Sequence, residues 1–119
     1  MVLGNALTEW LLGVCPLWPH GVRPAHFGAP LSGALPVLVL AGEHDPVTPP
    51  RYGEAIVRNL PRGRLLQVTG QGHGVLTVGC MPRLVSEFLR TLAARQLDAH
   101  CLDALGQTPV FVDANGANP

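Results

Sequence analysis

The pattern of apolar and polar residues predicts two strand–helix pairs in the second half of the chain. Pro36–Gly42 is a continuous run of Val, Leu and Ala closed by Gly, which is typical of a strand buried on both faces of a parallel sheet. Arg64–Val68 predicts a second strand. Apolar residues at helical spacing predict helices over Pro50–Asn59 and Pro82–Ala94. The order strand–helix–strand–helix indicates an α/β protein with an open parallel sheet.

The two ends of the chain have a weaker pattern. Ala6–Gly13 predicts a short helix, and the loop after it is broken repeatedly by Pro and Gly. Val2–Cys15 has no basic n-region and no small-residue cleavage site, so we interpret it as folded protein and not as a signal peptide. Thr108–Asp113 predicts a short edge strand or an extended strap. We divide the chain into a leading segment, 1–33, and a sheet-bearing part, 34–119.

Composition and charge exclude several classes of protein. With 119 residues, the chain fits one domain or a part of one, and its 47% apolar residues are too many for a disordered chain. Eight basic and eight acidic residues give a net charge of zero, so we expect no nucleic-acid partner. Every apolar run is far shorter than the roughly 20 residues that cross a bilayer, so we expect no membrane span.

Two ionisable residues follow the two predicted strands, Asp45 after the first and His73 after the second. Ligands and catalytic groups of open α/β sheets gather at the carboxyl ends of the strands. A right-handed crossover brings both loops to one edge, where neighbouring strands lie about 4.8 Å apart. When a carboxylate accepts a hydrogen bond from one imidazole nitrogen, the other nitrogen is left to act as a general base. Taken singly, Asp45 could instead cap the helix near Thr48, and His73 could be a solvated loop residue.

Several motifs together resemble the C-terminal part of an α/β-hydrolase. The acid loop and its strand, Pro36–Pro50, and the histidine loop, Gly70–Gly74, are similar to those of serine aminopeptidases related to proline iminopeptidase, in the tripeptidyl aminopeptidase branch. Cys15–Pro19 and the later cysteines Cys80 and Cys101 also resemble the pattern of that family. The resemblance spans about residues 15–119.

The resemblance implies that Asp45 is the acid and His73 the base of a catalytic triad. The hydrolase order of nucleophile, acid and histidine is kept, but the chain has no G-x-S-x-G elbow. Ser32 has no strand before it, and Ser86 falls within a predicted helix, after the acid. We therefore expect the nucleophile and the oxyanion hole in an N-terminal hydrolase segment upstream of Met1.

The expected function is that of the C-terminal segment of a serine hydrolase, an aminopeptidase acting on the N-termini of peptide substrates. Two strands alone cannot cover both edges and faces of a buried sheet, so we expect the fold to be incomplete on its own. The alternative is a catalytically inactive truncated fragment, or an interaction module that keeps the last strands of the hydrolase fold.

The residues beside Asp45 offer two further assignments. Glu43 is a weak candidate for orienting a substrate amine, and the alternative is an exposed loop carboxylate. His44, Asp45 and His73 could be metal ligands, but zinc sites usually have three or four ligands at tight spacing, and adjacent residues tend to point apart. We expect neither a metal nor another cofactor.

The three cysteines allow one disulfide and leave one residue over. The family resemblance implies a bond between Cys80 and Cys101, and the alternative is two buried thiols. Such a disulfide implies a periplasmic or secreted compartment for the full-length enzyme. The chain alone does not indicate its own compartment.

Overall fold

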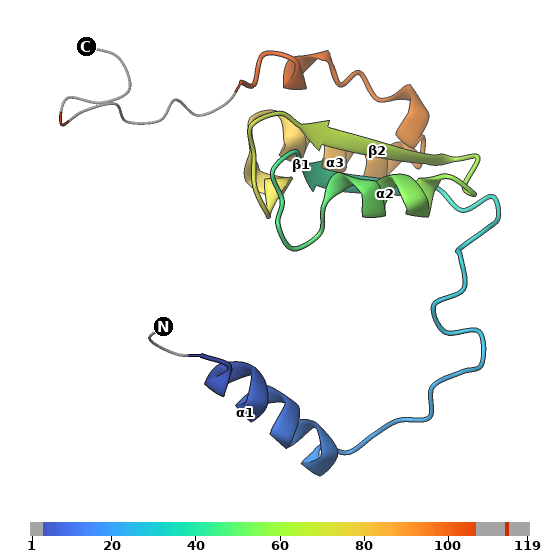
Figure 1. The fold of residues 1–119 in the computed structure, drawn as a ribbon. Helices are drawn as coiled ribbons and strands as arrows, with labels where there is room; N and C mark the ends of the chain where they lie inside the picture. Colours follow the sequence, from blue (N-terminus) through green and yellow to red (C-terminus); the bar gives the residue numbers. More distant parts are fainter. Residues whose placement is uncertain (1–3, 107–113, 115–119) are drawn as a thin grey trace.

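The computed structural model describes residues 4–106 and 114, so the expected strand or strap at 108–113 lies outside the described residues. Figure 1 shows a two-stranded sheet with helices packed on it, connected by a long loop to an N-terminal helix. The predicted order of strands and helices is confirmed. The elements are α1 (Ala6–Val14), β1 (Val37–Gly42), α2 (Pro50–Val57), β2 (Gly63–Val68) and α3 (Met81–Thr91), with short 3₁₀ turns η1 (Cys15–Leu17), η2 (Val75–Thr77), η3 (Ala94–Gln96) and η4 (His100–Leu102).

Both later helices end before their predicted boundaries. In α2 the last regular residue is Val57, whose carbonyl accepts the N–H of Leu60 in a turn just ahead of Pro61. In α3 the helix ends because Leu92 takes a left-handed conformation with φ 53°, and its N–H closes the last turn on Phe88. The apolar periodicity of the sequence continues beyond Val57 and Thr91, so the pattern alone predicts helices that end too late.

The sheet consists of β1 and β2 paired in parallel. The register sets Leu40 beside Leu66 and Gly42 beside Val68, so the two strands end level with each other. Helix α2 makes the connection between them, as Figure 1 shows. Because parallel strands in register finish at the same edge, the loops that follow them begin next to each other.

Helices cover the two faces of the sheet, which gives three layers. On one face, a Cβ atom added to Gly53 of α2 would lie 3.0 Å from Val39 and 2.9 Å from Leu65, so this helix packs tightly on the strands. The other face carries the main core, where the β2 side chains meet α3 and the segment after it. The buried members of that core are Leu66, Val68, Val75, Met81, Leu84, Leu97 and Leu102.

The cover is incomplete at β1 and in the leading segment. The strand residues 37–40 are only partly buried, as expected for a sheet that is incomplete on its own. None of residues 4–35 is buried, and α1 lies apart from the sheet (Figure 1). In the described part of the chain, no helix has both the length and the apolar content that a membrane span requires.

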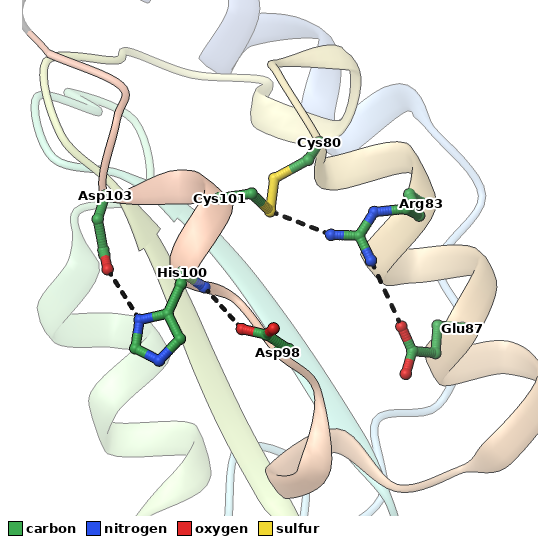
Figure 2. Close-up of a disulfide and its surroundings, with 7 residues drawn as sticks. All are labelled: Cys80, Arg83, Glu87, Asp98, His100, Cys101 and Asp103. Atoms are coloured by element: carbon green, nitrogen blue, oxygen red, sulfur yellow. Dashed lines mark hydrogen bonds and ion pairs between the residues drawn. A yellow bond between two sulfur atoms is a disulfide. The ribbon is translucent and has the colours of Figure 1, made fainter.

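A disulfide joins Cys80, at the start of α3, to Cys101 in η4. The two Cα atoms lie 6.3 Å apart, and the bond brings the segment after α3 back to the beginning of that helix, as Figure 2 shows. Arg83 on the first turn of α3 donates a hydrogen bond to the sulfur of Cys101 at 3.3 Å. Cys15 is a free, exposed thiol.

The end of β1 touches the loop that follows β2. A Cβ atom on Gly42 would overlap the carbonyl oxygen of Gly72 and come within 2.5 Å of the carbonyl oxygen of Gln71. Only a residue without a side chain leaves space for this approach. The absence of a side chain at Gly42 therefore sets how closely the two loops can meet.

Breaking the disulfide is expected to lower the free energy of unfolding by about 3 kcal/mol, because the open chain gains conformational freedom when unfolded. Urea melts of the full chain with and without reductant, and of Cys101→Ala, measure this change. Cys15→Ala is the matched control, since that thiol has no disulfide partner. Equal urea midpoints in the oxidised and reduced forms would contradict the role of the bond.

Gly42→Ala is expected to destabilise the chain by about 1–3 kcal/mol, because the new methyl group must displace the backbone of the neighbouring loop. Gly72 is the matched control: a Cβ atom there has no heavy atom within 4 Å, so Gly72→Ala should change stability by no more than about 0.5 kcal/mol. Urea denaturation compares the two variants. Similar losses in both would show that the contact at Gly42 is not the cause.

Candidate active site

Asp45 is held by a tight turn directly after β1. Its backbone N–H bonds the carbonyl of Gly42 at 3.2 Å, and its side-chain Oδ1 accepts the backbone N–H groups of Val47 at 2.8 Å and Thr48 at 2.9 Å. Only 4% of the Asp45 side chain is exposed. The turn therefore buries a carboxylate and satisfies one of its oxygens with the local backbone.

His73 lies on the loop after β2, which is bonded to the acid loop at several points. The N–H of Glu43 bonds Val68 at 3.0 Å, and the N–H of His44 bonds Gln71 at 2.9 Å. Directly after His73, Gly74 has φ 88°, a left-handed conformation that glycine adopts readily. These backbone bonds extend the pairing of the strands into their loops and bring the imidazole towards Asp45.

The two predicted residues are in direct contact. His73 Nδ1 lies 2.8 Å from Asp45 Oδ2, which is hydrogen-bond distance. The same oxygen accepts the hydroxyl of Thr48 at 2.8 Å. The alternative in which Asp45 only caps a helix near Thr48 is not what the structure shows, because α2 has Pro49 at its N-cap and no side-chain cap bond.

The hydrogen bonds around Asp45 favour its ionised form. Burial by itself raises the pKa of this carboxyl, but the backbone and hydroxyl donors of Thr48, together with His73 and Val47, outweigh it. The pKa of Asp45 therefore lies well below its ordinary value. At neutral pH the carboxylate is therefore charged, and it can accept a hydrogen bond from an N–H at Nδ1 of the imidazole.

A pocket of about 210 Å³ opens beside the pair. Residues at the end of β1 and in both loops line it, including Asp45, Thr48 and His73. In contrast to Asp45, 60% of the His73 side chain is exposed. Neither Ser32 nor Ser86 belongs to the pocket lining. The arrangement combines a buried acid with an accessible imidazole, and the described residues bring no serine hydroxyl to it.

Glu43 is placed by the structure between the two loops. Its Oε2 accepts the N–H of Gly70 at 2.8 Å and lies 3.7 Å from His44 Nε2. It does not line the pocket beside His73. The candidate role in binding a substrate amine stays a prediction, while the bond to Gly70 identifies a structural contact that the sequence did not suggest.

The described residues show no grouping of three or more His, Cys, Asp or Glu side chains that could hold a metal ion. A larger pocket, about 520 Å³, lies away from the acid–histidine pair, between Arg64 of β2 and residues 97–103. Arg64 donates to the carbonyl oxygens of Ala94 and Leu97, so its guanidinium fixes the backbone there.

Sequence reasoning missed the contact between Thr48 and Asp45. The spacing Asp-Pro-Val-Thr contained a signal for it, because an Asp side chain commonly accepts backbone N–H groups two and three residues later in a turn. Thr48 is also followed by two prolines, a pattern that is typical of a helix N-cap. The second of these does begin α2, but the hydroxyl points back to the acid.

Comparisons with known proteins give the family. The family described as TAP-like protein matches residues 1–101. Serine protease Hip1 of Mycobacterium tuberculosis is 32% identical over 91 residues, which cover 75% of this chain and 17% of that protein. Hip1 of Mycobacterium bovis matches with the same identity and coverage. No solved structure gives a significant match.

The matched part thus spans less than a fifth of the length of these relatives. The parallel strands of the chain, its covering helices and its family match agree with the expected C-terminal part of a hydrolase sheet. The chain belongs to the TAP-like family, the C-terminal domain of α/β-hydrolases.

Proposed function

We propose that this chain supplies the acid and the base of a Ser-His-Asp triad, with Asp45 as the acid and His73 as the base. The observation that carries the proposal is the 2.8 Å contact between the buried carboxylate and an exposed imidazole. The serine and the oxyanion donors come from a hydrolase segment outside this sequence. The likeness to a serine protease supports this division, because the match covers only 17% of that relative.

In the proposed reaction, the N–H at Nδ1 of His73 donates a hydrogen bond to Asp45, and Nε2 carries no proton. Nε2 removes the proton of the serine hydroxyl as that oxygen attacks the substrate carbonyl, and then delivers the proton to the leaving amine. Asp45 stabilises the imidazolium between these two steps. A carboxyl with a lowered pKa suits this role, because it stays ionised and does not take the proton from the ring.

The proposed substrates are peptides cut at their N-termini, in keeping with the resemblance to tripeptidyl aminopeptidases. The similarity to serine protease Hip1 supports peptide bonds as the target class. We further propose a periplasmic or secreted compartment for the full-length enzyme. The Cys80–Cys101 disulfide supports this, because such bonds persist mainly where the environment is oxidising.

His73→Ala is expected to lower kcat about 1,000-fold or more, because the serine loses its base. The measurement uses the chain together with the hydrolase segment that carries the G-x-S-x-G serine, and follows hydrolysis of an aminoacyl reporter. His100→Ala is the control, because this exposed histidine contacts Asp103 and not the acid.

Two outcomes would count against the proposal. Unchanged activity in His73→Ala would exclude this histidine as the base. No hydrolysis by the complete wild-type enzyme would favour an inactive fragment or interaction module.

Asp45→Asn is expected to destabilise the chain at neutral pH and to do so less as the pH falls. Because the folded-state pKa of Asp45 is lowered, its stabilising effect is fully present above the unfolded-state value of about 3.9 and is lost as pH falls towards the folded value. Urea melts of both proteins from neutral pH to well below the unfolded-state pKa measure the difference. Asp103→Asn, at an exposed site, is the control. A pH-independent difference in stability between the wild-type protein and the Asp45→Asn variant would rule out this linkage.

A further inference from the structure

We infer that Thr48 is a positioning residue for the acid–histidine pair, an inference that rests on the proposed function. Thr48 contacts Asp45 twice, through its backbone N–H to Oδ1 at 2.9 Å and through its hydroxyl to Oδ2 at 2.8 Å. Its hydroxyl oxygen also lies 3.4 Å from His73 Nδ1. One side chain therefore contacts both members of the pair.

The hydroxyl fixes the plane of the Asp45 carboxylate. The N–H groups of Val47 and Thr48 both bond Oδ1, which anchors one oxygen but does not by itself set the direction of the other. The Thr48 hydroxyl bonds Oδ2, the oxygen that faces His73. With both oxygens held, the carboxylate presents Oδ2 to the imidazole at a defined angle.

The same bond selects the tautomer of His73. A hydroxyl has one proton, and in Thr48 that proton is directed at Asp45. At 3.4 Å from Nδ1, the Thr48 oxygen can then act only as an acceptor, as Asp45 Oδ2 does. Two acceptors facing Nδ1 favour a hydrogen on that nitrogen. Nε2 is left without one, which is the form that a general base requires.

Two substitutions separate the hydroxyl from the shape of the side chain. Thr48→Val keeps the branched shape and removes the hydroxyl, whereas Thr48→Ser keeps the hydroxyl and removes the methyl group. Both keep the backbone N–H that bonds Asp45 Oδ1. Thr77→Val is the matched control, because this exposed threonine shows no side-chain hydrogen bond within the described region and does not line the pocket.

The first measurement is the ring-nitrogen chemical shift of His73 in the full chain, which reports the ratio of the two neutral tautomers and needs no activity. We expect Thr48→Val to lower the ratio of the Nδ1–H to the Nε2–H form about 5-fold, the effect of losing one net hydrogen bond. Thr48→Ser and Thr77→Val should keep the wild-type ratio. An unchanged ratio in folded Thr48→Val, or equal losses in the Val and Ser variants, would overturn the inference.

The second measurement uses the complete enzyme with its serine segment. Thr48→Val should lower kcat about 10-fold or more with little change in KM, because misorientation affects the chemical step, and Thr48→Ser should retain activity. A rise in KM with unchanged kcat would mean that Thr48 contacts substrate and does not position the pair. A wild-type enzyme without activity would refute the proposed function, while the tautomer ratio would still decide the role of Thr48.

Discussion

The parallel pairing of β1 and β2 is the constraint on which the rest of the structure depends. The strand register pairs Gly42, the last residue of β1, with Val68, the last residue of β2. The acid loop and the histidine loop therefore start side by side at the same edge of the sheet. Backbone bonds from Glu43 and His44 continue the pairing past the strands. A shift of one residue would turn the strand side chains to the opposite faces and separate the two loops. The pairing of the strands therefore brings Asp45 and His73 together, and side-chain hydrogen bonds then fix their orientation.

Around this frame, the part of the chain that the structure describes buries one charged side chain, that of Asp45. Asp45 is almost fully buried, yet each oxygen has donors: two backbone N–H groups for Oδ1, and Thr48 and His73 for Oδ2. A buried carboxylate without such partners would be neutral at ordinary pH or would destabilise the fold. The same contacts that make burial tolerable also orient the carboxylate, so stability and the proposed chemistry share one set of bonds.

Much of this organisation could be predicted from the sequence. The continuous apolar run before Gly42 indicated a buried parallel strand, and the placing of Asp45 and His73 after consecutive strands indicated that they would meet, as they do. The end of α3 could not be predicted, because the left-handed turn falls at Leu92, where no Gly or Pro signals it. The contacts of Thr48 and Glu43 depend on the path of single loops, which periodicity does not determine.

The short separation of Asp45 and His73 along the chain has a consequence for folding. They are 28 positions apart, and one helix, α2, and one strand, β2, lie within that interval. Loop-closure entropy grows with the logarithm of length, so bringing these two groups together is inexpensive compared with recruiting a residue hundreds of positions away. A low cost in loop-closure entropy therefore accompanies the assembly of this half of the proposed catalytic centre, which one strand, helix and strand in sequence bring together.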